Sequence, residues 1–227
     1  MSSPSPLPEC PEDRLRSRPG RRFRGWPAWI LLAAALGCAL LFGARAYPFL
    51  AVPTHRVPAE VLVVEGWIFD YGLDAAAVEF RQGHYASVAI SGRLFSSTEA
   101  GDPDDSYARR AAQALTARGI PSASIVVCPA PATGWNRTSS SARAVRDHLA
   151  ARHNACTGMN VLTIGPHARQ TWLAYRRIMG PNLRVGIITV PKQGVDTDRW
   201  WASAHGIAMV LKDFAGWLKE WLFGYRH

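Results

Sequence analysis

The sequence predicts an α/β protein: a Rossmann-like three-layer domain with a mainly parallel five-stranded sheet, preceded by one N-terminal transmembrane helix. Five short aliphatic runs alternate with segments of helical apolar spacing, and this alternation predicts parallel strands joined by crossover helices. The first run, Val61 to Val64, is apolar at every position, which is typical of a strand buried on both faces. An almost wholly apolar segment precedes this run and is long enough to span a bilayer.

The chain has 227 residues and a formal net charge of +9. Its length suits one domain with an appendage. Arginines crowd the tail directly before the apolar segment, where positive charge usually sets membrane orientation, so we expect a membrane partner and no nucleic acid. We expect five parts: a disordered basic cytoplasmic tail (1–25), a transmembrane helix (26–46), an extended linker (47–59), the Rossmann-like domain (60–195) and a C-terminal amphipathic helix (196–227).

The arginine excess before the apolar segment predicts a single-pass anchor with its N-terminus in the cytoplasm and the domain outside. Two alternatives stay open. Ala44-Arg45-Ala46 has the form of a signal-peptidase site, and Arg21-Arg22 partly matches a twin-arginine signal. An uncleaved anchor is favoured because the apolar run is longer than the roughly 7–15 residues of a signal-peptide core.

Turn and cap residues separate the predicted elements. Gly83, Gly119 and Gly180 follow three of the helices, as glycine commonly does at a helix end. In order, we expect strand 61–64, helix 73–82, strand 87–91, a helix from Asp104 or Asp105 to Arg118, strand 125–128, a helix from Thr138 or Ser139 to about Arg152, strand 160–164, helix 168–179, strand 185–190 and a last helix of about 198–223.

The last helix carries an apolar stripe at helical spacing, which allows two interpretations. The favoured one is a helix packed on the sheet. The alternative is contact with a membrane surface through Trp217, Trp221, Phe223 and Tyr225.

Polar residues follow each predicted strand, and in a parallel sheet these positions converge on one edge. Gly92 permits close backbone approach, while Thr138 and the helix that it opens could hold an anion. Arg137 and Arg169 are candidate bidentate partners of that anion. His167 and Asp70 are the candidate catalytic residues, with His167 as an acid or base. The candidate ligand-binding residues are Glu65, Gly66, Trp67, Ser91, Gly92, Arg93, Arg137, Thr138 and Arg169.

A structural interpretation competes with this one, since His167 could bond a loop carbonyl while the arginines are solvated. Several common motifs are missing. The sequence has no G-x-G-x-x-G after the first strand, no P-loop and no G-x-S-x-G elbow, and we assign no cofactor. His148 and His153 are five residues apart rather than four, so we expect no metal site there. Cys128 and Cys156 fall towards opposite edges of the predicted sheet, so we expect free thiols.

Several segments together resemble the YdcF/SanA/ElyC-like family over roughly Glu60 to Pro191. They are VLVVEGW, FRQGHY, AISG, DSYARRAAQAL, RTSSSARAVRDHL and IGPHARQTWLAYRRIMG. The resemblance implies a Rossmann-like domain behind one membrane segment, in the bacterial plasma (inner) membrane, with a role in envelope and cell-wall integrity. The matching positions are Gly66, Ser91, Gly92, Thr138 and His167.

The chain departs from the family pattern at several of these motifs. Arg93 replaces the second glycine of the Ser-Gly-Gly turn, and Ser140 stands where the family has a glutamate. The family has an arginine three residues after the histidine, whereas this chain has Arg169 two residues after His167. The loss of that glutamate puts an inherited catalytic activity in doubt.

Three functions remain. The first is an extracytoplasmic, membrane-anchored protein that binds an anionic small molecule in envelope biogenesis. The second is a non-catalytic scaffold or partner-binding membrane protein with a vestigial pocket. The third, a cytosolic nucleotide-binding enzyme, is disfavoured by the apolar segment.

Overall fold

The structure is a computed structural model that describes residues 26–95, 105–152 and 156–224. The predicted disordered tail, 1–25, lies outside the described residues. The chain divides into two compact units, residues 1–40 and 41–227, which are described separately.

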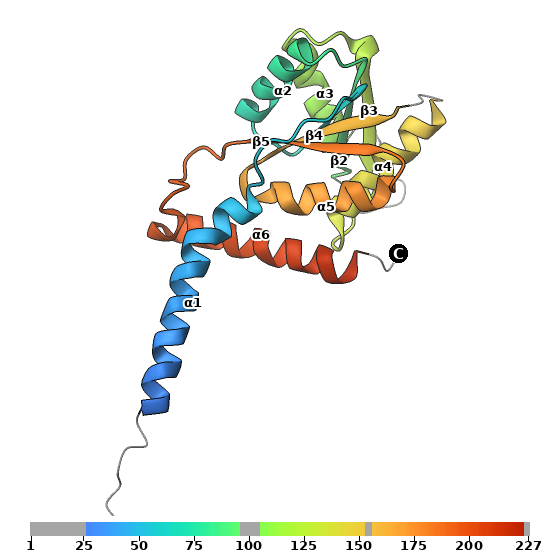
Figure 1. The fold of residues 1–227 in the computed structure, drawn as a ribbon. Helices are drawn as coiled ribbons and strands as arrows, with labels where there is room; N and C mark the ends of the chain where they lie inside the picture. The colour runs from blue at the N-terminus through green and yellow to red at the C-terminus, as the bar shows by residue number, and fades with distance from the viewer. Residues whose placement is uncertain (1–25, 96–104, 153–155, 225–227) are drawn as a thin grey trace, which may run out of the picture. The chain divides into compact units, whose positions relative to one another are not determined.

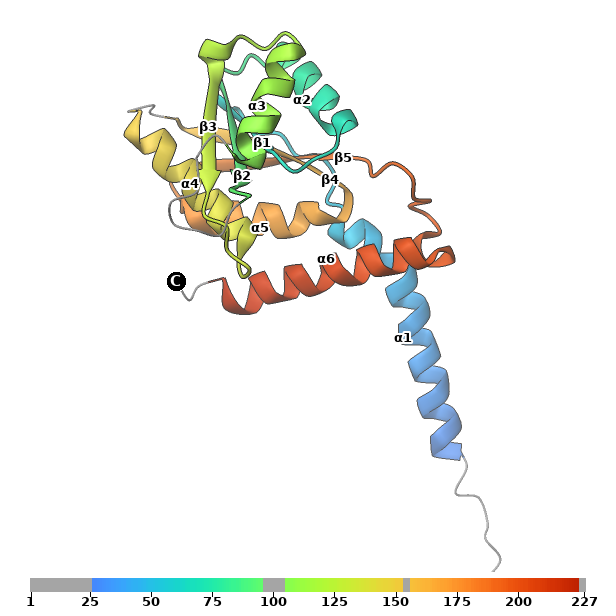
Figure 2. The same cartoon turned by 180° about the vertical axis from the view of Figure 1, so that it is seen from behind.

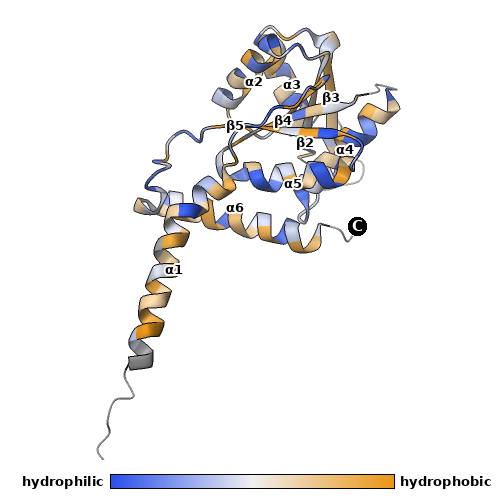
Figure 3. Ribbon diagram, viewed as in Figure 1, coloured by the Kyte–Doolittle hydropathy of each residue, from blue (hydrophilic) through white to orange (hydrophobic). Residues whose placement is uncertain are grey.

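The first helix, α1, runs from Trp26 to Leu50. Among the described residues one helical stretch, Trp29–Leu50, is long and apolar enough to cross a membrane, judged by length and composition. Figure 3 shows α1 as hydrophobic along most of its length. The helix was expected to end at residue 46, but it continues for another turn because Tyr47 and Leu50 are buried against Trp200 and Val210.

Five strands form one sheet in which every neighbouring pair is parallel, as the sequence predicts (Figure 1). The spatial order is β3-β2-β1-β4-β5. This order belongs to the doubly wound α/β fold, and it reverses between β1 and β4. The strands are β1 (Val61–Glu65), β2 (Ser87–Arg93), β3 (Ile125–Ala130), β4 (Gly158–Ile164) and β5 (Arg184–Val190).

Alternate residues of β1 enter two different hydrophobic clusters, which explains why its first four positions, Val61 to Val64, are all apolar. Leu62 and Val64 pack with α2 and α3, whereas Val61 and Val63 pack with α4 and α5. The views of Figures 1 and 2 agree that these two helix pairs lie on opposite faces of the sheet. The helices are α2 (Asp70–Gln82), α3 (Tyr107–Ala117), α4 (Arg137–Ala151) and α5 (Ala168–Met179). The described cysteines, Cys38, Cys128 and Cys156, are free.

The predicted linker is not a free spacer. His55 forms an antiparallel bridge with Ile187, and the side chain of Thr189 donates to the carbonyl of Val52 over 2.6 Å. The segment therefore covers the outer edge of β5, where unpaired backbone groups would otherwise invite pairing with another chain.

The last helix, α6 (Ala204–Phe223), follows a short 3₁₀ turn at Trp200–Ala202. Ser203 caps it by accepting a hydrogen bond from the backbone N–H of Gly206. Its buried face includes Val210 and Asp213 and contacts α5, while Leu211 and Leu222 on another face are exposed. The sequence favoured a helix packed on the sheet, but α6 packs instead on α5 and the end of α1, and it keeps a second apolar face in solvent. Tyr225 lies outside the described residues.

Candidate functional site

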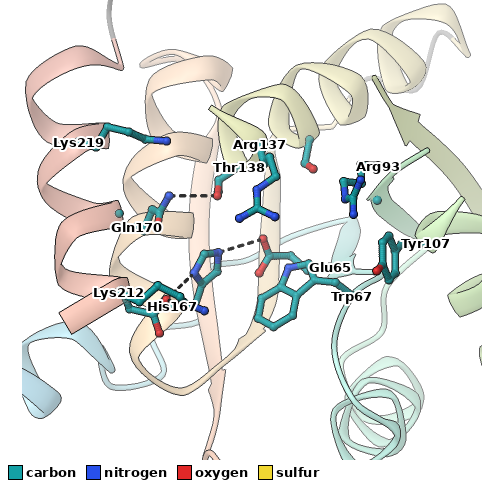
Figure 4. A pocket seen from close by; sticks show the side chains of 14 residues that line it. Glu65, Trp67, Arg93, Tyr107, Arg137, Thr138, His167, Gln170, Lys212 and Lys219 are labelled. Atoms are coloured by element: carbon teal, nitrogen blue, oxygen red, sulfur yellow. Dashed lines mark hydrogen bonds and ion pairs between the residues drawn. The ribbon is translucent and has the colours of Figure 1, made fainter. Parts of the chain in front are cut away.

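A cavity of about 310 Å³ lies at the carboxyl edge of the sheet, beside the point where strand order reverses between β1 and β4 (Figure 4). Ligands of doubly wound sheets bind at this position. The cavity is lined by Glu65, Trp67, Gly92, Arg93, Tyr107, Arg137, Thr138, Ser141, His167, Gln170, Lys212, Asp213, Gly216 and Lys219.

His167 lies between two carboxylates that line the cavity, one of them the Glu65 carboxylate seen beside the imidazole in Figure 4. Its Nδ1 is 3.3 Å from Oδ1 of Asp213, and its Nε2 is 3.9 Å from Oε1 of Glu65. The indole of Trp67 meets the imidazole edge to face, with ring centroids 5.1 Å apart. These contacts hold the imidazole between β1 and α6 and fix its orientation.

Glu65 is the last residue of β1 and is only 2% exposed. Its carboxylate accepts hydrogen bonds from the hydroxyls of Thr163 on β4 and Thr171 on α5. A buried carboxylate is costly unless it is hydrogen-bonded or paired, and here it has both kinds of partner. Glu65 is therefore a fixed negative charge that faces His167.

The surroundings of His167 favour its protonated form. Burial lowers the pKa of His167, but the hydrogen bond that His167 donates to Asp213 and the charge of Glu65 outweigh burial, so the pKa is raised above its ordinary value of 6.5. The imidazolium is thereby suited to donate a proton or a hydrogen bond to a bound group. The Nε2–H is the available donor, because Glu65 is beyond hydrogen-bond distance.

Four cationic side chains surround the rest of the cavity: Arg93, Arg137, Lys212 and Lys219. Among the described residues, two carboxylates line it, Glu65 and Asp213, so the positive charges of these residues exceed the negative ones by two before His167 is counted. Within the described part of the chain, Arg93 and Arg137 have no ion-pair partner; Arg93 lies over the ring of Tyr107 instead. The guanidinium of Arg137 points into the cavity towards Glu65 and His167 (Figure 4).

The N-terminus of α4 contributes a further source of positive potential. Asn136 precedes the helix with φ of 56°, and its side chain makes no capping bond. The first N–H groups of a helix have no partner within the helix, so an uncapped start favours an anion. Thr138 lies in this first turn and accepts a hydrogen bond from the amide of Gln170 over 3.2 Å. As expected from the sequence, Arg137 and Thr138 both line the cavity.

Two glycines let the chain pass closely at the other end of the site. A Cβ on Gly92 would come within 2.4 Å of the backbone nitrogen of Ala108, and one on Gly66 within 2.7 Å of the carbonyl oxygen of Tyr107. Gly92 lines the cavity, whereas Gly66, also predicted to bind the ligand, does not line it and donates its N–H to the carbonyl of Ser91. Ser91, another predicted ligand-binding residue, does not line the cavity either, because its hydroxyl is buried and accepts a hydrogen bond from Tyr175.

Two other predicted site residues, Arg169 and Asp70, do not line the cavity. The Arg169 side chain hydrogen-bonds the carbonyl of Phe49 and stacks over the Phe49 ring, 3.9 Å from its centroid. Asp70 opens α2 with an exposed side chain and pairs with Arg118 over 3.1 Å. The prediction that both residues line the cavity is wrong. The Arg169 side chain contacts Phe49 at the end of α1, and Asp70 pairs with Arg118 at the end of α3.

We did not predict from the sequence that α6 lines the cavity with Lys212, Asp213, Gly216 and Lys219. One signal was present: Asp213 interrupts a stripe that contains Val210, Phe214 and Trp217. An acidic residue inside a buried stripe indicates a buried polar partner, which here is His167. Tyr107, Ser141 and Gln170 were also missed.

In the described residues, no group of three or more histidine, cysteine, aspartate or glutamate side chains is arranged to hold a metal ion. Comparisons of the chain with protein-family models, with curated proteins and with solved structures found no match. Fold and site together define an α/β protein with a cationic cavity at the switch point of a parallel sheet.

Proposed function

We propose that this protein is membrane-anchored and binds an anionic small molecule, such as a phosphorylated or nucleotide-linked compound, in the cavity beside β1 and β4. The observation that carries the proposal is the set of four cationic side chains around one cavity, at the uncapped start of α4. Helix N-termini and forked guanidinium groups are the features that proteins use most often to hold phosphate and carboxylate groups.

The charges are arranged so that a ligand would be oriented. Arg93, Arg137 and Lys219 line the cavity together with the start of α4, while Glu65 and Asp213 flank the two ring nitrogens of His167. An anionic group is attracted to these cations and repelled by the two carboxylates, so it would lie over the start of α4, with the Nε2–H of His167 as a donor to one of its oxygens. His167 would then donate a hydrogen bond, or a proton where the ligand is turned over.

The cellular setting follows from the sequence and the resemblance. The apolar helix and the arginines before it support a single-pass anchor in the plasma (inner) membrane, with the N-terminus in the cytoplasm and a Rossmann-like domain outside. The likeness to the YdcF/SanA/ElyC-like family supports a role in bacterial envelope or cell-wall biogenesis.

A thermal-shift screen of the full chain in detergent micelles tests the binding proposal. The probes are inorganic phosphate and pyrophosphate, sugar phosphates, nucleoside mono- and diphosphates, and matched uncharged sugars. A ligand present at 100 times its dissociation constant stabilises the folded state by about 2.7 kcal/mol, which raises the melting temperature measurably. We expect at least one anionic probe, and none of the uncharged ones, to raise it.

The variant Arg137→Gln/Lys212→Gln should lose that rise, because it removes two of the cations that line the cavity. Arg146→Gln is the matched control, since Arg146 lies on the same helix but pairs with Asp147 outside the cavity. Equal shifts in both variants would reject the cavity as the binding site. If no anionic probe stabilises the wild type, the non-catalytic scaffold becomes the better account.

A further inference from the structure

One face of α6 is apolar and exposed although the opposite side of the helix is packed. Ile207, Leu211, Leu218 and Leu222 follow one another at intervals of four, seven and four residues, which places them on a single stripe. Each is between 36% and 51% exposed. Large contiguous apolar patches on soluble surfaces mark contact sites. The stripe therefore needs an occupant.

Aromatic rings form a continuous chain of contacts beside this stripe. Trp201 contacts Trp200, which meets Phe42 near the end of α1; Phe42 in turn contacts Phe214 at 5.4 Å. The chain continues through Trp217 to Trp221, with centroid distances of 5.5 and 6.4 Å. Tryptophan is enriched where proteins meet the membrane–water interface, because its ring is apolar and its N–H is polar. Both ends of this chain, Trp201 and Trp221, are exposed.

The length of α1 indicates where these rings would lie relative to the bilayer. Its apolar stretch has 22 residues; at about 1.5 Å per residue, a helix of that length matches a hydrocarbon core of about 30 Å. If α1 spans the bilayer, the segment from Phe42 to Leu50 ends at the outer interface. The same segment contacts α6, since Phe49 meets Trp217 at 4.9 Å and Trp200 donates a hydrogen bond to the carbonyl of Gly43.

The charges of α6 fit the same arrangement. No charged residue falls on the stripe, whereas Lys212 and Lys219 lie seven residues apart along one flank. Lys212 pairs with Asp213 and Lys219 lies over the ring of Trp135, so both ammonium groups belong to the cavity side of α6 and leave the stripe uncharged.

We propose that α6 lies on the outer surface of the bilayer, with its exposed apolar stripe inserted at the boundary between headgroups and acyl chains. This inference rests on the proposed membrane anchor and adds a second point of lipid contact to it. Because Lys212, Asp213 and Lys219 of the same helix line the cavity, the site is held directly beside the membrane surface.

Spin-label accessibility in vesicles tests the proposal. The full chain, with its four cysteines replaced by alanine, is reconstituted into vesicles of phosphatidylethanolamine and phosphatidylglycerol and labelled at Leu211→Cys or Leu222→Cys. Two reference positions are Leu36→Cys within α1 and Val78→Cys, an exposed apolar position on α2. Collision rates are measured with oxygen, which concentrates in lipid, and with a water-soluble nickel chelate.

We expect the labels at 211 and 222 to favour oxygen, as the label at 36 should, while the label at 78 favours the nickel chelate. If 211 and 222 behave like 78 while 36 favours oxygen, the anchor stands and the surface contact of α6 is refuted. If 36 also favours the chelate, the anchor fails and the inference fails with it. Spin–spin broadening at 211 and 222, with shielding from both reagents, would show that a second copy occupies the stripe and would refute the lipid contact.

A second measurement avoids the cysteine substitutions. Brominated lipids quench tryptophan fluorescence at short range, so the quenched fraction should fall from wild type to Trp221→Phe. An unchanged quenched fraction would contradict insertion of this end of α6.

Discussion

The protonation of His167 links the chemistry of the cavity to the stability of the fold. Asp213 and Glu65 favour the imidazolium strongly enough to overcome burial, so the pKa of His167 is higher in the folded chain than in the unfolded one. A raised folded-state pKa means that protonation stabilises the fold. This contribution is complete below the unfolded-state value near 6.5 and is lost as pH rises through the higher folded-state pKa.

The stability difference between wild type and His167→Gln should therefore be largest in acid and shrink as the pH is raised. Thermal unfolding of both proteins across about pH 5 to 9 measures it. Asp213→Asn removes a hydrogen bond and a charge that raise the pKa of His167, so it should shift the transition to lower pH. A difference that grows with pH would contradict the assignment of Asp213 and Glu65 as the groups that hold the imidazolium.

At this scale the sequence predicted most of the cavity residues that directly follow a strand. Glu65, Trp67, Gly92 and His167 line one cavity because parallel strands deliver their carboxyl ends to the same edge. Side-chain direction could not be predicted in this way. Arg169 follows β4 as closely as His167 does, yet it turns to Phe49, a contact that depends on where α1 ends.

The segment before β1 is held on the sheet by the side chain of Asn160. Asn160 of β4 is buried, accepts a hydrogen bond from the N–H of Val57 and donates to the carbonyl of Val57, each at 2.9 Å. It also donates to the hydroxyl of Tyr85 over 3.0 Å. These bonds tie the segment that covers β5 to the middle of the sheet.

Asn160→Ala should lower the free energy of unfolding by about 3 kcal/mol, at about 1 kcal/mol for each of its three hydrogen bonds. Denaturant unfolding followed by circular dichroism measures this loss, and hydrogen exchange should rise first in residues 51–59. Thr116→Ala is the control, since it removes one hydrogen bond on the exposed side of α3 and should cost less than about 1 kcal/mol. A loss no greater than that of the control would show that Asn160 does not hold the segment.

The elements themselves were largely predictable because their signals are local. Aliphatic runs predicted all five strands, and the helices began and ended within four residues of the predicted positions, except that α6 begins at Ala204 rather than near residue 198, after the 3₁₀ turn at Trp200–Ala202. The linker was the exception. Its pairing with β5 depends on strand order, which periodicity does not encode, and the same is true of the turn that α1 gains by packing on Trp200.

At the scale of the whole molecule, α6 takes part in packing, in the cavity and in the exposed apolar surface. One face packs on α5 and the end of α1, a second lines the cavity with Lys212, Asp213 and Lys219, and a third presents the apolar stripe. The sequence indicated an amphipathic helix and left open whether it packed on the domain or met a membrane. Its place in the cavity could not be predicted, because lysines on a helix flank look the same whether they face solvent or a ligand.

The most direct test of the anion site is calorimetric titration of the strongest anionic probe into wild type, Arg137→Gln and Arg146→Gln. A hydrogen bond to a charged group contributes about 1.5–3 kcal/mol, so Arg137→Gln should weaken binding by about 10-fold or more. Arg146→Gln should bind like the wild type, and wild-type affinity should fall as salt is raised. Equal affinities for the two variants would contradict the claim that this cavity binds the anion.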